Sequence, residues 1–172
     1  YQSYYQGIHR ANYHSYLISQ MSIPEPVKNN AIGELKFLKA WSYFNLVQNF
    51  GEVVLYKTSV SEGAPLYQPR ATVKEVYEYI IEELKYAEDA MYSTKDPAWK
   101  PGHPSRGAAK ALLAKVYCTI GAASMPAGAS VSVMEGVPFY LDDDGNKVRV
   151  PYPARQTFAK EQVAGYESFD SK

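Results

Sequence analysis

The stretch Ala31–Tyr56, AIGELKFLKAWSYFNLVQNFGEVVLY, decides the fold of this chain. Its apolar residues are too numerous for one narrow helical stripe, so a helix that runs to about Asn49 must be covered on two sides. Such a helix is typical of a stacked helical array. Gly51 follows where a left-handed C-terminal cap belongs, and Val53–Tyr56 is predicted as a short extended segment.

Prolines and capping residues place further helices on both sides of this stretch. Residues 1–21 are predicted as a helix, and Pro24 and Pro26 then mark a break and a new helix start. The stripe along one face of the first helix consists of Tyr5, Ile8, Asn12, Tyr16 and Ser19. Downstream, Thr72 and Glu75 can form a capping box that covers free amides at the start of a third helix. Apolar residues at clean helical spacing follow it, which makes this the clearest helix prediction.

Residues 106–120 are predicted as a fourth helix, which Ser105 can cap. Small side chains are frequent in it and let a neighbouring helix approach closely. Four helices in two pairs, with interlocking small and large residues, predict a helical-repeat architecture over residues 1–121. Two pairs are few for such a stack, so we expect the chain to be part of a longer one.

The composition changes after the fourth helix. Residues 122–155 are rich in Gly, Pro, Ser and Val and are predicted as an irregular insertion. Within it, Phe139–Leu141 and Val148–Val150 are predicted as a β-hairpin around an Asp144–Gly145 turn. Residues 156–172 are expected to hold a short helix near 157–164 and the truncated end, so that residues 1–172 form part of a single helical domain.

The composition also excludes several classes of protein. With 21% charged and 46% hydrophobic residues, the 172-residue chain has an ordinary globular balance, which argues against wholesale disorder. A net charge of zero argues against a nucleic-acid-binding or polybasic membrane-surface protein. Cys118 is the single cysteine, so it makes no internal disulfide and is expected to be a packing residue.

Tyrosine is the compositional outlier, with 16 residues. Its flat apolar face and its hydroxyl suit carbohydrate binding, protein interfaces and wet cores alike. The excess is therefore suggestive of function but does not decide between these uses.

No motif of catalysis or metal binding is found in the sequence. His9 and His14 are five residues apart, whereas a helical metal pair needs a spacing of three or four. The turn at 142–146 does not fit the spacing of an EF-hand calcium loop. Glu82 and Glu83 are expected to be solvated on an amphipathic helix. We therefore predict no metal site, no cofactor and no catalytic residue.

Three blocks of the sequence, in order, resemble the SusD/RagB family. The first has Ala40–Trp41, Tyr43–Phe44 and Phe50–Val53 where the family has a helix end followed by Phe-Gly-Asp-Val-Pro-Leu. Glu52 replaces the usual aspartate, and Val54 replaces the usual proline.

The second block begins at Pro69–Thr72 and continues with Glu75–Tyr77 and Ile80–Leu84. The third, Gly107–Tyr117, is similar to the family pattern nearly residue by residue. Together the resemblance covers about residues 1–122.

This resemblance implies an all-α protein built on tetratricopeptide-like helix pairs with a more irregular remainder. It implies a lipoprotein on the outer face of the outer membrane of Bacteroidota that binds glycans and is not an enzyme. Its partner would be a SusC-like TonB-dependent transporter, to which it delivers oligosaccharides for import. Family members run to several hundred residues, so we expect this chain to be a segment of the N-terminal half, without the lipid anchor.

No binding motif of the family can be carried over to a position in this chain. Trp41, Phe44, Tyr77 and Tyr117 lie on helical stripes and are expected to be in the core. Loops carry function more often than scaffolds do, so the candidates for glycan contact are aromatic residues of loops and edges: Trp99, Tyr67, Tyr140, Tyr152, Tyr1 and Tyr4.

Two other function classes compete with glycan binding. The helix pairs alone would also support a tetratricopeptide-type scaffold that binds only protein. An all-helical glycosidase is disfavoured because no carboxylate pair can be assigned from spacing. Saturable binding of polysaccharide without product would distinguish the glycan-binding hypothesis from both.

Overall fold

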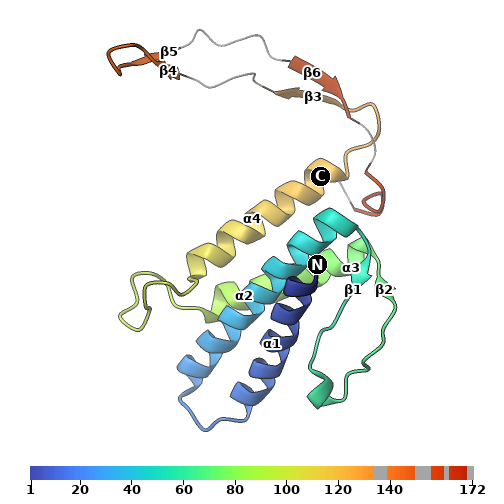
Figure 1. The fold of residues 1–172 in the computed structure, drawn as a ribbon, viewed down its shortest axis with the longest axis vertical. Coiled ribbons are helices and arrows are strands. Elements are labelled where there is room, and N and C mark those ends of the chain that lie inside the picture. The colour runs from blue at the N-terminus through green and yellow to red at the C-terminus, as the bar shows by residue number, and fades with distance from the viewer. Residues whose placement is uncertain (134–138, 150–155, 161–162, 170–172) are drawn as a thin grey trace.

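The computed structural model describes residues 1–133, 139–149, 156–160 and 163–169. Over these ranges the body of the fold is helical (Figure 1), with α1 (Gln2–Ser19), α2 (Glu25–Phe50), α3 (Val73–Ala90) and α4 (Arg106–Ala123). The remaining elements are β1 (Val53–Val54), the 3-10 turn η1 (Val60–Glu62), β2 (Arg70–Ala71), β3 (Ser130–Val133), β4 (Phe139–Leu141), β5 (Lys147–Arg149) and β6 (Gln156–Ala159). The prediction of helix pairs with an irregular insertion is confirmed.

The helices begin where the capping residues predict. The Thr72 hydroxyl accepts a hydrogen bond from the Glu75 amide at 3.2 Å, and the Glu75 carboxylate accepts one from the Thr72 amide at 2.8 Å. This capping box satisfies two amides that the first turn of α3 leaves free. The Ser105 side chain accepts from the Ala108 amide at the start of α4.

None of the helices in the described residues is long and apolar enough to span a membrane.

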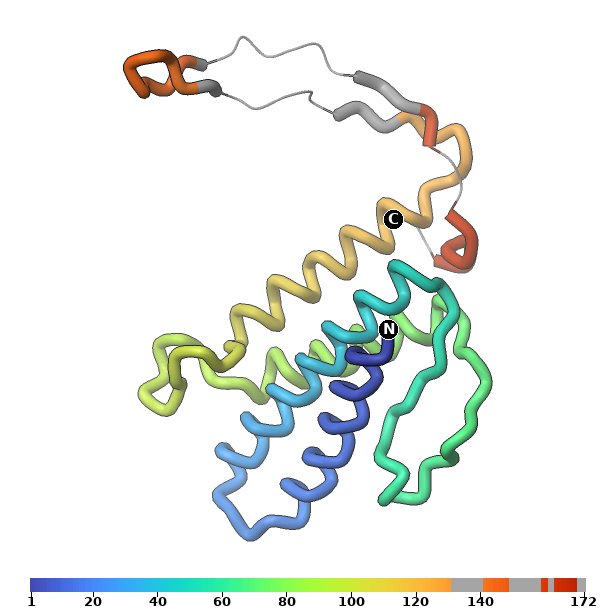
Figure 2. Tube along the Cα trace, in the orientation of Figure 1, coloured from blue at the N-terminus to red at the C-terminus, as the bar shows by residue number. Residues whose placement is uncertain are grey.

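Helix α2 is the centre of the array. It packs against α1 on one side and against α3 on the other, and α4 covers α3. The segment between α2 and α3 leaves the end of α2, loops out beside α1 and returns to α3 (Figure 2). Its two ends are joined by the antiparallel pair β1–β2, in which Val53 faces Ala71 and Val54 faces Arg70.

The core contains tyrosine as well as aliphatic residues. Tyr43 and Tyr77 are fully buried among Leu46, Ile80 and Leu84, and Phe44 stacks edge-on against Tyr77 with 6.2 Å between ring centres. Phe44 and Tyr77 were predicted to be core residues, and this is confirmed. Buried aromatic pairs of this kind are worth about 0.5–1.5 kcal/mol beyond the area they bury.

The chain after β6 returns to the helical core. The hydroxyls of Tyr77 and Tyr166 are 2.7 Å apart, and Phe169 stacks edge-on against the Tyr77 ring. Gly165 makes this approach possible: it has a φ of +87°, and a Cβ on it would lie 2.7 Å from a methyl group of Val73. A larger residue there would push the return segment away from α3.

Four expectations about single residues are wrong. Trp41 is 45% exposed, because it borders the open hollow between α1 and α2, and Tyr117 is 46% exposed on α4. Cys118 is also exposed, on the outer face of α4. Glu83 is buried instead of solvated, with only 3% of its surface exposed, because two lysines of α2 lie opposite it.

The predicted short helix near 157–164 is also wrong. Residues Gln156–Ala159 form β6, which pairs antiparallel with β3 so that Val133 faces Gln156 and Ser130 faces Ala159. Beyond it, the Lys160 amide donates to the Ala129 carbonyl. The strand arm therefore extends past residue 155, the expected end of the insertion. The main-chain N–H and C=O groups of a helix bond within the helix, so a helix here would have left the main-chain groups of β3 without these partners.

The predicted β-hairpin is confirmed. β4 pairs with β5, with Tyr140 opposite Val148, and Gly145 takes the left-handed conformation in the turn. The Asp142 carboxylate accepts from the amides of Asp144 and Asn146, which holds the turn closed. Figure 1 shows both strand pairs lying away from the helices, on an arm beyond the end of α4.

A buried ion pair joins α2 to α3. Lys39 is 4% exposed, and its ammonium lies 2.8 Å from the Glu83 carboxylate. Lys36, one turn earlier on α2, pairs with the same carboxylate. Burial lowers the pKa of Lys39, and the charge of Glu83 opposes that shift. Glu83 therefore supplies the counter-charge that the buried Lys39 ammonium needs.

We expect Glu83→Ala to destabilise the protein by about 3–5 kcal/mol, because Lys39 would be left buried without its counter-ion. Glu82→Ala, at the exposed neighbouring position, is the matched control and should change the unfolding free energy by less than about 0.5 kcal/mol. Urea unfolding monitored by circular dichroism measures both. Replacing the pair together, Lys39→Met with Glu83→Leu, should recover most of the loss, and equal effects of the two alanine variants would contradict this account.

The buried tyrosines predict a loss of stability in alkali. Burial raises the pKa of Tyr43 and of Tyr79 far above the usual value. Above about pH 10 the unfolded chain therefore loses these protons first, and the free energy of unfolding falls by up to about 1.4 kcal/mol per pH unit for each tyrosine. The lowered pKa of Lys39 makes the free energy of unfolding rise with pH instead of fall. This rise ends near the unfolded lysine pKa of about 10.4.

Thermal melts between about pH 9 and 12 test this expectation. Tyr79→Phe should make the decline shallower, since it removes one of the buried ionisations. Tyr67→Phe, at an exposed position, is the matched control. A melting temperature that stays constant over this range would contradict the assignment.

Candidate functional site

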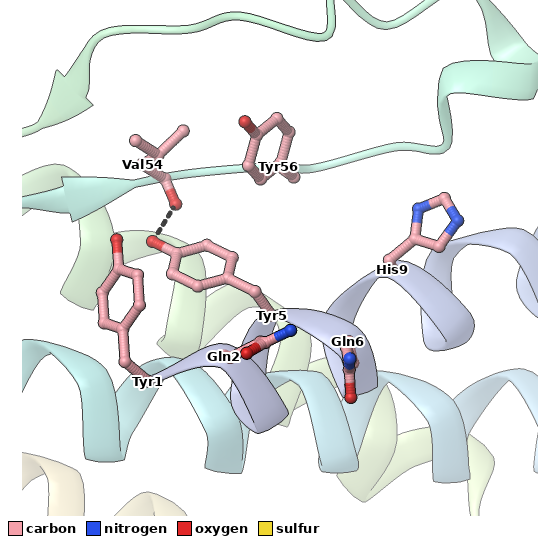
Figure 3. Close-up of a pocket in the computed structure, with 7 residues that line it drawn as sticks. All are labelled: Tyr1, Gln2, Tyr5, Gln6, His9, Val54 and Tyr56. Carbon is pink, nitrogen blue, oxygen red and sulfur yellow. Dashed lines mark hydrogen bonds between the residues drawn. The ribbon is translucent and has the colours of Figure 1, made fainter.

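An aromatic groove lies between α1 and the segment that follows β1 (Figure 3). It consists of a hollow of about 490 Å³ and an adjoining one of about 220 Å³, which share Tyr5, His9 and Tyr56. The residues that line the groove are Tyr1, Gln2, Tyr5, Gln6, Ile8, His9, Asn12, Val54, Tyr56, Thr58, Val60 and Leu66.

Three tyrosine rings form the apolar surface of this groove. Tyr1 and Tyr5, one helical turn apart on α1, have ring centres 5.1 Å apart, and Tyr5 meets Tyr56 edge-on at 6.1 Å. The rings of Tyr1 and Phe50 also meet edge-on, at 5.2 Å, which ties the start of α1 to the end of α2. Flat aromatic faces grouped in this way can stack against the apolar faces of sugar rings.

Side chains of the core hold the far wall of the groove in place. Residues 55–58 belong to no helix or strand, so their main-chain groups need other partners. The Tyr43 hydroxyl accepts from the Tyr56 amide at 2.7 Å, and the Asn12 amide donates to the Tyr56 and Thr58 carbonyls at 2.9 and 3.2 Å. At the near end, the Tyr5 hydroxyl donates to the Val54 carbonyl at 2.9 Å, as Figure 3 shows.

The buried ion pair supports the same wall. The Lys39 ammonium donates to the Asn12 side-chain oxygen at 2.9 Å and to the Lys57 carbonyl at 3.3 Å. The Tyr79 hydroxyl also donates to the Lys57 carbonyl. Asn12 is itself buried, so its orientation is fixed by these bonds. The groove is therefore preformed, which lowers the ordering cost of binding.

Polar side chains with unused hydrogen-bonding capacity line the near edge of the groove. Gln2, Gln6 and His9 follow one another along one face of α1 and are exposed. Within the described ranges, none of these three side chains makes a hydrogen bond. Burial raises the pKa of Tyr5, and the neighbouring Tyr1 adds to that effect, so the Tyr5 hydroxyl is neutral at physiological pH. The groove thus offers aromatic faces together with the amide donors and acceptors of Gln2 and Gln6.

Of the six residues predicted for glycan contact, Tyr1 lines this groove and the others do not. Tyr4 faces a separate hollow of about 540 Å³ between α1 and α2, with its ring centre 5.7 Å from that of Trp41. Tyr67 is 90% exposed and follows Leu66 at the edge of the groove. Tyr140 lies on β4 in the strand arm, and Tyr152 lies outside the described residues.

Trp99 lines a third hollow, of about 310 Å³, in the loop between α3 and α4. The polar groups that line this hollow already bond to one another. The Trp99 ring N–H donates to the His103 carbonyl, and the His103 ring lies 2.8 Å from the Glu34 carboxylate. Asn30 donates to the same carboxylate and accepts from the Tyr92 amide. These contacts anchor the loop to α2 and leave little capacity for a ligand.

Sequence reasoning missed Tyr5, Tyr56 and the two glutamines of α1. The i, i+4 spacing of Tyr1 with Tyr5 and of Gln2 with Gln6 places each pair on one helix face, and this spacing was available in the sequence. Tyr56 left no such signal, because it reaches the groove only through the path of the segment after β1.

No group of three His, Cys, Asp or Glu side chains in the described ranges is placed to hold a metal ion. His14 bonds instead to the Arg10 carbonyl of its own helix at 2.7 Å. The Asp142 carboxylate is occupied by the amides of its turn.

Comparison with known proteins identifies the family and the fold. A protein family described as "Starch-binding associating with outer membrane" (SusD-like) matches residues 1–118. A SusD-like protein of Bacteroides ovatus is 31% identical over 99 residues, which cover 58% of this chain and 17% of that protein.

Solved structures of similar proteins share the fold. A crystal structure with xylogluco-oligosaccharide superposes with a TM-score of 0.61 at 27% identity and covers 72% of this chain and 23% of that one. A laminarin-binding SusD-like protein gives a TM-score of 0.58 at 30% identity, with coverage of 71% and 26%. This chain thus spans about a quarter or less of the length of these relatives.

The family match extends over more than half of the chain and includes all four helices except the end of α4. The sequence blocks that resemble SusD/RagB proteins lie within it. The chain therefore belongs to the SusD-like family.

Proposed function

We propose that this chain is part of a cell-surface lipoprotein that captures oligo- or polysaccharide and delivers it to a SusC-like TonB-dependent transporter for import. It would be held at the extracellular face of the outer membrane through a lipid anchor outside these residues. The aromatic groove is the observation that carries this proposal, because it combines grouped tyrosine rings with unpaired amide side chains. Both are what a sugar ring requires: a flat apolar surface and neutral hydrogen-bonding groups.

The relatives support the glycan as ligand. One similar structure contains xylogluco-oligosaccharide, and another belongs to a laminarin-binding protein. The family description names both starch binding and association with the outer membrane. The transporter partner and the import role extend this description, and binding without bond cleavage is the proposed mechanism.

A protein-binding scaffold is the second candidate, and a specific surface favours it. The hollow between α1 and α2 is lined by Leu35, Leu38 and Trp41, and Leu38 and Trp41 are exposed. Apolar side chains on adjoining helices are typical of a surface that packs against another polypeptide. This surface lies on the opposite edge of α1 from the groove, so the two functions can be separated by mutation.

We expect Tyr1→Ala to weaken glycan binding about tenfold, which corresponds to about 1.4 kcal/mol. Tyr1 is exposed, so its truncation removes a stacking face without opening the core. Trp41→Ala, which removes an exposed aromatic ring on the other side of α1, is the matched control and should leave glycan binding unchanged.

Retardation of the protein in gels that contain plant, host or microbial polysaccharides measures both variants. Loss of retardation in the Trp41 variant with full retention in the Tyr1 variant would move the site to the α1–α2 hollow. No retardation of the folded protein by any polysaccharide would favour the scaffold hypothesis, and a pull-down of the transporter would then test it.

A further inference from the structure

We infer that the aromatic groove takes an uncharged oligosaccharide, laid along α1 across Tyr5 and Tyr56, and that it discriminates against uronic and sulfated glycans. This inference rests on the proposed function and specifies the class of ligand for the same site. Three properties of the groove carry it: the charge of its lining, its free hydrogen-bonding groups and its division into two hollows.

The lining has no fixed charge. Among the described residues, neither hollow of the groove is lined by a carboxylate, an ammonium or a guanidinium group. Three other hollows of the molecule each have at least one, such as Arg10, Glu34 and Arg70. The contrast shows that a neutral lining is a property of this groove and not of every concave surface of the protein.

Three charged groups near the groove, Glu62, Lys39 and Lys57, have partners of their own. Glu62 accepts a hydrogen bond from the Ser59 amide as part of a capping box. The Lys39 ammonium is buried against Glu83, and the Lys57 ammonium lies over the Tyr79 ring at 5.6 Å. A glycan carboxylate or sulfate would therefore lose water against tyrosine rings without a lysine or arginine in the lining to pair with, which is unfavourable.

The free polar groups match hydroxyls. The side-chain amides of Gln2 and Gln6 each carry donors and an acceptor, and a sugar hydroxyl can use both kinds. The Tyr56 hydroxyl donates to the Leu66 carbonyl at 2.9 Å and keeps its acceptor capacity for a ligand. Gln2 and Gln6 belong to α1 and Tyr56 to the segment after β1, so polar groups come from both walls of the groove (Figure 3).

The shape indicates more than one sugar unit. The two hollows of about 490 and 220 Å³ adjoin at Tyr5, His9 and Tyr56 and succeed one another along α1. Together they lie within the range of about 300–1,000 Å³ that is usual for ligand sites. An oligosaccharide can occupy both, whereas a monosaccharide would leave one of them to water.

Affinity electrophoresis of the protein tests the inference. The neutral polysaccharides laminarin and xyloglucan are compared with polygalacturonate, alginate and carrageenan, and titration calorimetry with neutral oligosaccharides of increasing length follows. We expect retardation by a neutral polysaccharide, and affinity that rises at least about tenfold from monosaccharide to the length that fills both hollows.

A charge introduced into the groove sharpens the test. Gln6→Lys should weaken neutral binding severalfold and strengthen retardation by the anionic polysaccharides about tenfold. Gln20→Lys adds the same charge at the exposed end of α1, away from the groove, and should do neither. Both positions are exposed, so folding is not at issue, and circular dichroism verifies it.

The outcomes separate this inference from the proposed function. Retardation of the unaltered protein by anionic polysaccharides alone would overturn the neutral specificity and leave glycan binding intact. Neutral binding that Gln6→Lys and Gln20→Lys affect equally would place the sugar outside the groove and also overturn the inference. Absence of retardation by every polysaccharide would overturn the proposed function itself.

Discussion

The buried contact between Lys39 and Glu83 is the interaction on which the rest of this structure depends. It joins α2 to α3 at the centre of the helical array, and through Asn12 it reaches α1. Burying two charges costs several kcal/mol per ion unless geometry and further hydrogen bonds compensate it. Lys39 gains that compensation from hydrogen bonds to Asn12 and to the Lys57 carbonyl. The same bonds hold the wall of the groove in place.

This construction also explains the richness in tyrosine. A segment without helix or strand passes next to the core after β1, and its peptide groups cannot be left unpaired. The hydroxyls of Tyr5, Tyr43 and Tyr79 bond to it while their rings fill the core or the groove wall. These tyrosines are therefore explained by the need to pair main-chain groups next to the core. The ring of Tyr1 and the exposed side of Tyr5 face the groove instead.

The exposed aromatic residues have a different setting. Trp41 and Tyr117 occur at helical spacing with core residues, yet Trp41 borders an open hollow between α1 and α2 and Tyr117 is 46% exposed on α4. The chain spans about a quarter or less of the length of the relatives that were compared. In an array of stacked helices each pair is covered by its neighbours, so an apolar residue on the outer side of such a pair is exposed until a neighbour is present.

The four helices, the caps of α3 and α4 and the family resemblance could all be predicted from local sequence. Periodicity and capping are local properties that a few consecutive residues establish, as Thr72 with Glu75 and the hairpin turn at Gly145 illustrate. The burial of Glu83, the pairing of β6 with β3 and the assembly of the groove were decided only by the tertiary structure. Each of these depends on which surface lies opposite a residue. Glu83 has the spacing of a solvated residue until Lys36 and Lys39 of another helix face it, and Tyr56 becomes a groove residue only because its chain is bonded beside α1.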